Sequence, residues 1–136
     1  MTVAFNYNKT EVDDRETINP ISGGRVEALE DVLPNVKGNI AWNHTQGQLR
    51  TLVRASYYGA WKSTGNGYTL GATTLVDAQV AYDYTENSEL VLGVENLFDE
   101  YPDKNPGRGG VGQLYPEDSP FGFNGGSWYL QARYSF

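Results

Sequence analysis

Apolar and polar side chains alternate along residues 126–136. The apolar side begins and ends with aromatic rings, and its members are Trp128, Leu130, Ala132, Tyr134 and Phe136. Amphipathic rings settle at the two interfaces of a bilayer, and about ten tilted residues span its hydrocarbon. The pattern therefore favours a strand that crosses a membrane. The last strand of a soluble sandwich is the alternative.

The same two-residue period predicts five further strands, at residues 2–8, 36–45, 48–61, 73–84 and 89–98. Tight turns at 46–47 and 85–88 alternate with polar, turn-rich connections at 9–33, 62–71 and 99–125, and a single helical turn is expected at 25–31. Short turns at one end and long loops at the other are typical of transmembrane barrels. The predicted fold is all-β: one domain, an antiparallel up-and-down meander of about six strands, forming a segment of a transmembrane β-barrel.

A meander fixes which end of each strand lies at which rim, so the aromatic positions can be sorted. The short-turn rim would carry Trp42, Tyr82, Tyr84, Tyr134 and Phe136. The long-loop rim would carry Tyr57, Trp61, Phe98 and Trp128. Between these two girdles the same face has no charge. A small soluble β-barrel or sandwich that binds a small ligand would bury this face and would not need two aromatic rings, and it stays the alternative.

Composition narrows the choice of partners. The net charge of -7 over 136 residues makes nucleic acid a poor partner, and the absence of cysteine excludes disulfides and thiolate chemistry. No apolar run approaches the roughly 18 residues of a spanning helix. The first residues lack the basic and apolar regions of a secretory signal, so an outer-membrane protein would need more than this chain.

Few side chains suggest catalysis or metal binding. His44 is the sole histidine and falls on the apolar face, where an interfacial role is expected, so we expect no enzyme, cofactor or metal site. Glu11, Asp13, Asp14 and Glu16 could bind a divalent cation, but their spacing matches no ordered calcium loop, and a solvated loop is favoured.

Charged residues on the opposite, polar face predict a row across four strands. If the 85–88 turn pairs Asp83 with Glu89, then Asp77 lies opposite Glu95, because residue numbers across an antiparallel pair keep a constant sum. Like charges directly opposed are unfavourable. We therefore expect cations at the same height, and the row would be Arg54, Asp77, Glu95 and Arg133.

Four short segments resemble one family. Residues 94–101 read Val-Glu-Asn-Leu-Phe-Asp-Glu-Tyr, which is similar to the Asn-Leu-Phe-Asp-x-x-Tyr motif in the penultimate strand of TonB-dependent outer-membrane receptors. Residues 33–36 (Leu-Pro-Asn-Val), 74–78 (Thr-Leu-Val-Asp-Ala) and 134–136 (Tyr-Ser-Phe) resemble further motifs of that family in the same order. Lys37 stands where a second proline is usual. The resemblance covers nearly the whole chain, as the C-terminal portion of a barrel of about 22 strands.

The resemblance implies TonB-coupled uptake of a scarce solute, of the siderophore-iron, cobalamin or oligosaccharide class, across the outer membrane of a Gram-negative bacterium. The C-terminus would be periplasmic. Implied partners are outer-membrane lipid, the remainder of the barrel and its plug, the TonB system through the missing N-terminal region, and the barrel-assembly machinery through Phe136. The outer loops would share ligand binding, with packing on neighbouring loops as the favoured alternative for the candidates Arg108, Tyr115, Phe121 and Phe123.

Overall fold

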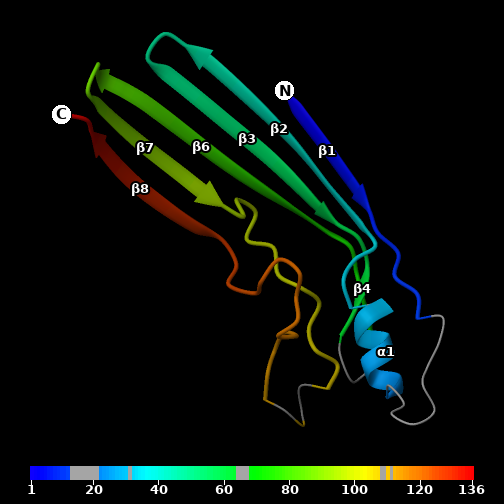
Figure 1. Cartoon of the computed structure of the whole chain (residues 1–136). Coiled ribbons are helices and arrows are strands. Elements are labelled where there is room, and N and C mark those ends of the chain that lie inside the picture. Colours follow the sequence, from blue (N-terminus) through cyan, green and yellow to red (C-terminus); the bar gives the residue numbers. More distant parts are fainter. Residues whose placement is uncertain (13–21, 31, 64–67, 108–109, 111) are drawn as a thin grey trace.

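The chain forms one long antiparallel sheet in a computed structural model that describes residues 1–12, 22–30, 32–63, 68–107, 110 and 112–136. Six strands lie in the order β1-β2-β3-β6-β7-β8, so each strand pairs with its neighbour in sequence apart from the inserted β4 and β5 (Figure 1). Their bounds are β1 Thr2–Tyr7, β2 Val36–Gln46, β3 Leu49–Tyr58, β6 Thr73–Thr85, β7 Ser88–Glu95 and β8 Ser127–Tyr134. The expected six-stranded meander is confirmed.

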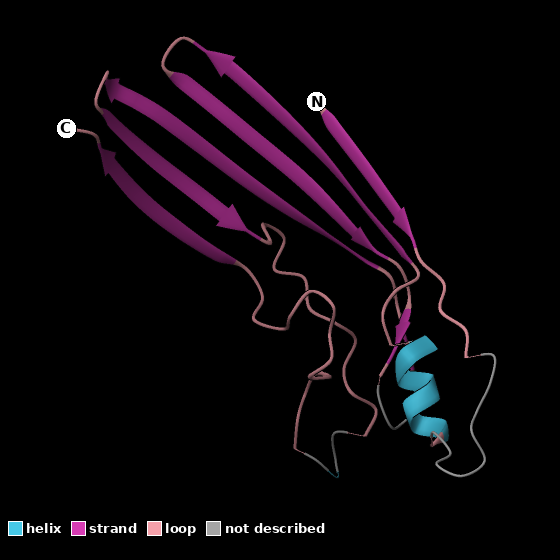
Figure 2. Ribbon diagram, in the orientation of Figure 1, coloured by secondary structure: helices cyan, strands magenta, loops and turns pink. Residues whose placement is uncertain are grey.

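Tight turns set the pairing at one end of the sheet. Gly47 has a φ of 60°, a conformation that glycine adopts without strain, and it lets β2 turn directly into β3. Asp83 pairs with Glu89 across the β6–β7 hairpin, as expected for the short 85–88 turn, and the register then shifts between Asp83 and Thr85. The N- and C-terminal ends of the chain lie on opposite edges of the sheet (Figure 2).

The other end carries the long connections, a two-stranded hairpin and a helix. β4 (Trp61–Lys62) pairs with β5 (Thr69–Leu70), and α1 (Gly23–Glu30) is found at the same end of the molecule (Figure 1). The helix was expected at 25–31, whereas the hairpin was missed. The strand expected at 48–61 ends at Tyr58, and Trp61 is only 2% exposed because it packs in this end region. Placing Trp61 in a membrane girdle was therefore wrong.

β7 is also shorter than expected: it ends at Glu95, whereas the expected strand ended at Phe98. Asn96 and Asp99 have φ values of 51° and 56°, so the backbone turns out of the strand at these residues. Phe98 remains 65% exposed beyond the strand end. β8 spans 127–134, inside the expected 126–136.

The two faces of the sheet differ in the way the alternation predicts. Large apolar side chains on one face are exposed, among them Ile40, Trp42, Leu92, Trp128 and Leu130. No second layer covers them within the described residues. β1 and β8 are the edges of the sheet, so the described part of the chain does not close into a barrel. No helix among the described residues is long and apolar enough to cross a membrane.

Candidate functional site

Arg54 and Asp77 form the central ion pair of the polar face. The two residues are direct partners in the β3–β6 register, and Arg54 Nη2 and Nε donate to Asp77 Oδ2 at 2.8 and 3.0 Å. The other Asp77 oxygen, Oδ1, accepts the Asn96 backbone N–H at 2.9 Å. Both carboxylate oxygens of Asp77 are thus occupied, which reduces its repulsion of nearby Glu95.

The second half of the expected charge row is wrong. Arg133 pairs with Glu89 in the β7–β8 register, and Glu95 pairs with Ser127. The long 99–125 connection does not fix how β8 slides along β7, and every shift by an even number of residues preserves the faces. The register that forms is displaced by six residues from the expected one.

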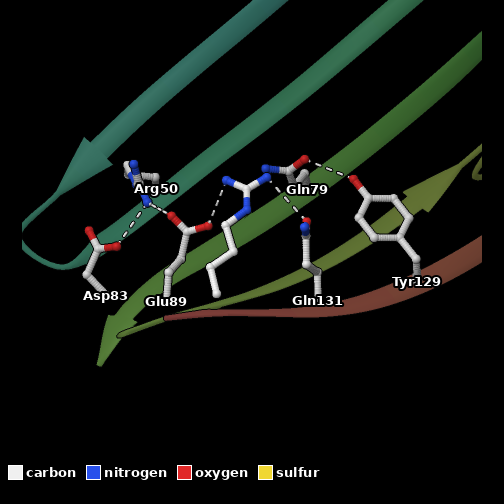
Figure 3. Close-up of polar contacts among 7 residues, drawn as sticks. Arg50, Gln79, Asp83, Glu89, Tyr129 and Gln131 are labelled. Atoms are coloured by element: carbon white, nitrogen blue, oxygen red, sulfur yellow. Dashed lines mark hydrogen bonds and ion pairs between the residues drawn. The ribbon is translucent and has the colours of Figure 1, made fainter. Parts of the chain in front are cut away.

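Arg133 instead joins a network near the tight turns, together with Arg50, Asp83 and Glu89, which are labelled in Figure 3. Glu89 accepts from Arg50 Nη2 and from Arg133 Nη1, the latter at 3.3 Å, and Arg50 also donates to Asp83 at 2.9 Å. One residue from each of β3, β6, β7 and β8 therefore gives the signs basic, acidic, acidic and basic. The predicted order of charges forms across these strands, but with Arg50, Asp83 and Glu89 in place of Arg54, Asp77 and Glu95.

Tyr129 of β8 lies across Gly93 of β7 and reaches β6. Its hydroxyl donates to Gln79 Oε1 at 2.9 Å (Figure 3). Gly93 is the register partner of both Tyr129 and Gln79, and a side chain there would meet the Tyr129 ring. Glycine at position 93 thus makes room for a tyrosine that links three strands.

The segment that follows β7 folds into a compact turn. The Asn96 side chain, only 8% exposed, donates from Nδ2 to the Glu100 carbonyl at 2.8 Å and accepts the Glu100 N–H at 3.0 Å. Asparagine suits this position because it tolerates positive φ and its short amide can bond to nearby backbone groups.

Asp99 and Tyr101 hold the two ends of the long connection together. Asp99 Oδ1 accepts the Gly126 N–H at 2.7 Å, and the Tyr101 hydroxyl donates to the Asp99 carboxylate. That hydrogen bond, and then the charge of Asp99, raise the pKa of Tyr101 above its ordinary 10.0. A side chain at Gly126 would lie 2.7 Å from the Asn96 carbonyl oxygen. We call Asn96, Asp99, Tyr101 and Gly126 the loop clasp.

Further contacts tie the long connection to its neighbours. Asp103 Oδ2 accepts the Gly71 N–H at 2.7 Å, and Ser63 donates to Asp118 at 3.5 Å. Pro116 is fully buried, and Trp61 and Leu70 are each 2% exposed. The long connection is therefore anchored to the β4–β5 hairpin as well as by the loop clasp.

The structure describes three of the four candidate ligand residues. Tyr115 stacks on Tyr101 with ring centroids 5.2 Å apart, and Phe121 packs on Tyr58 at 5.3 Å. Phe123 is 46% exposed. Arg108 lies outside the described residues. Tyr115 and Phe121 thus pack on a neighbouring loop residue and on the sheet end.

A hollow of about 570 Å³ lies between the end of this connection and the polar face. We call it the polar hollow; among the residues that line it are Arg54, Asp77, Glu95, Glu100, Phe121 and Ser127. Within the part of the chain that the structure describes, the carboxylates of Glu95 and Glu100 have no hydrogen-bonding partner. Their acceptor capacity is therefore available to a bound molecule.

The structure describes part of the candidate cation site and the surroundings of His44. No group of three or more histidine or carboxylate side chains among the described residues could hold a metal ion. Asp13, Asp14 and Glu16 fall outside those residues, and Glu11 pairs with Lys9. His44 stacks on Trp42 with ring centroids 5.4 Å apart and planes 4° from parallel.

Sequence reasoning could have found part of the missed network. Asp83 and Glu89 were already expected as a pair, and a like-charged pair calls for nearby cations. Arg50 also fell on the same face.

Comparison of the chain with protein-family models, curated proteins and solved structures found no match.

Proposed function

We propose that this chain is the closing part of the barrel of an outer-membrane receptor of the TonB-dependent type, which takes up a scarce solute. One observation carries the proposal: an uncharged face with exposed aromatic and aliphatic side chains extends over the sheet. Trp128 is 75% exposed, and Trp42 and Tyr82 are 47% and 43% exposed. An apolar patch of this extent needs a partner, and a bilayer supplies one with aromatic rings at both interfaces.

The stagger of the hairpins supports a tilted, barrel-like arrangement. The Gly47 turn begins beside Tyr82 of β6, whereas the β6–β7 turn begins beside Thr85, three residues farther along the same strand. Three residues extend about 10 Å, and the two hairpins lie about two strand spacings, or ~10 Å, apart. A strand tilt of roughly 45° would bring both turns to one level, and this is close to the tilt of membrane barrels.

The same tilt would separate the aromatic residues into two bands. Trp42 and Trp128 lie in one row of register partners, through Val53, Ala78 and Val94. The row crosses four strand spacings, so at a tilt of about 45° its ends would differ in height by about 14 Å. Trp42 would join Tyr82 and Tyr134 near the turns, and Trp128 would join Tyr57 and Phe98 near the long connections.

The contacts of the loop clasp support the resemblance to the receptor motif. Asn96, Asp99 and Tyr101, the three polar positions of that motif, each make a specific hydrogen bond. A chance match would not require all three to be used.

In this proposal the polar face lines the lumen, where it meets the plug and the rest of the barrel. The tight turns and the C-terminus face the periplasm. The barrel-assembly machinery recognises Phe136, and the TonB system acts through an N-terminal region. The competing reading, a small soluble ligand-binding barrel or sandwich, would need the exposed apolar face to be covered by protein.

Depth-dependent fluorescence quenching tests the proposal. The chain is reconstituted into phosphatidylcholine vesicles whose acyl chains carry bromine at defined depths. Variants that keep one tryptophan each, at position 42, 61 or 128, are compared. We expect bromine near the interface to quench Trp42 and Trp128 most strongly, since both are expected in the interfacial bands.

Trp61 is the matched control because it is buried at the loop end, and its emission should change little at any bromine depth. A monomeric chain that unfolds cooperatively in detergent-free buffer, with no quenching of Trp42 or Trp128, would contradict the membrane proposal.

A further inference from the structure

We propose that the polar hollow binds a neutral or cationic saccharide and discriminates against anionic solutes. This inference rests on the proposed function and narrows its solute class towards oligosaccharides. The volume of about 570 Å³ falls within the ~300–1,000 Å³ of small-molecule sites.

The carboxylates of the hollow favour a ligand rich in hydrogen-bond donors. Glu95 and Glu100 are unpaired carboxylates within the described residues, and an ionised carboxylate only accepts hydrogen bonds. The one guanidinium in the lining, Arg54, already donates to Asp77. Hydroxyl and ammonium groups match these acceptors. A phosphate or carboxylate of a ligand could accept from Ser56, Asn124 or Ser127, but it would lie against carboxylates, with the paired Arg54 as the cation of the lining.

The net negative charge of the lining also disfavours anionic ligands. Asp77, Glu95 and Glu100 line the hollow against a single cation, Arg54. The ammonium of Lys37 is nearby but stacks over the Tyr58 ring at 5.7 Å from its centroid. A concave site with an excess of one sign repels ligands of that sign, so an anionic iron chelate would be disfavoured.

An aromatic wall complements the carboxylates. Phe121 and Tyr58 both line the hollow, with ring planes inclined at 44°. The negative face of an aromatic ring suits the C–H groups of a sugar, which lie between its hydroxyls. A lining with both carboxylate acceptors and aromatic rings fits the two chemistries of a pyranose.

The loop clasp positions the covering segment of this site. Gly122, Asn124, Gly125 and Ser127 line the hollow, and Gly126 is fixed by its bond to Asp99. The site is thus preformed, which limits the entropy lost on binding.

Titrations of the full chain, ¹⁵N-labelled and in detergent micelles, test the inference. The probes are maltotriose, which is neutral, glucosamine, which is cationic, and citrate, which is anionic. We expect saturable shifts of the Gly122, Gly125 and Ser127 amides with both sugars and none with citrate. Glu95→Gln should weaken glucosamine binding roughly three- to tenfold, because a charged acceptor becomes neutral.

Glu86→Gln is the matched control, since it removes the same charge at the exposed β6–β7 turn. Phe121→Leu should weaken maltotriose binding while it keeps an apolar side chain against Tyr58. The inference is overturned by citrate binding as tight as that of the sugars, by no sugar shifts in a folded chain, or by equal effects of Glu86→Gln and Glu95→Gln.

The membrane proposal fails separately. Sugar binding by a chain that folds without detergent and escapes bromolipid quenching would leave the saccharide site standing and remove the receptor. A quenched chain that binds neither sugar would remove the saccharide site alone.

Discussion

The ring of Tyr129 lies over Gly93, the residue directly opposite it in the β7–β8 register. An ideal Cβ at position 93 would fall 2.5 Å from Tyr129 Cε1, closer than any side chain tolerates. The tyrosine continues across the glycine to donate to Gln79 at 2.9 Å. The absence of a side chain at Gly93 of β7 thus allows Tyr129 of β8 to contact Gln79 of β6.

Gly93→Ala should therefore displace the Tyr129 ring and break its bond to Gln79. We expect a loss of about 1–2 kcal/mol in the free energy of unfolding. Urea unfolding of the detergent-solubilised chain measures it. In a Tyr129→Ala background the same substitution should cost much less, because the obstructing ring is gone. Equal costs in both backgrounds would show that the ring does not constrain position 93.

Glu89, not Glu95, should be the energetic partner of Arg133. Glu89→Gln should lower the free energy of unfolding by up to about 1 kcal/mol, since Arg50 and Arg133 are half-exposed and solvent screens the pairs. A double-mutant cycle with Arg133→Gln isolates the coupling. The control cycle of Glu95→Gln with Arg133→Gln should give no coupling, and a larger coupling to Glu95 would restore the register first expected.

Asn96→Ala should destabilise the loop clasp more than Asn96→Gly. Both variants lose the two bonds to Glu100, but only alanine pays the cost of about 1 kcal/mol or more at positive φ. Hydrogen exchange of the Gly126 amide, together with urea unfolding, reports the difference. Equal exchange and stability in the two variants would argue against a constrained backbone at Asn96.

Tyr101 should titrate above its ordinary pKa of 10.0, because its hydroxyl donates to Asp99. A raised pKa in the folded state means that the hydrogen bond stabilises the clasp fully below pH 10.0. The contribution is then lost as pH rises through the folded-state pKa. The difference in absorbance titration between the chain and its Tyr101→Phe variant isolates this residue among the tyrosines. Asp99→Asn should move the pKa of Tyr101 down towards 10.0. An unchanged Tyr101 titration in this variant would show that its hydroxyl does not donate to Asp99.

The local pattern was sufficient for much of the sheet. The alternation of apolar and polar residues predicted the strands and the shared face of Trp42, Leu92 and Trp128, because successive side chains of an extended backbone point to opposite faces. The short turn from Asp83 to Glu89 also fixed the β6–β7 register, since it leaves the two strands little freedom to slide. The need for cations beside opposed carboxylates placed Arg54 beside Asp77, and the β3–β6 register confirms this pair.

Only the tertiary structure decided the features that depend on long connections. The register of Arg133 was open because a 99–125 connection permits several shifts that keep the faces, and packing of Tyr129 on Gly93 accompanies the one that forms. Trp61 continued the alternating pattern of β3, but it pairs with Leu70 in the β4–β5 hairpin and is buried. The sequence by itself thus determined which side chains share a face, since that follows from local geometry. The polar hollow and the loop clasp required the folded chain, because their residues come from segments that only tertiary packing brings together.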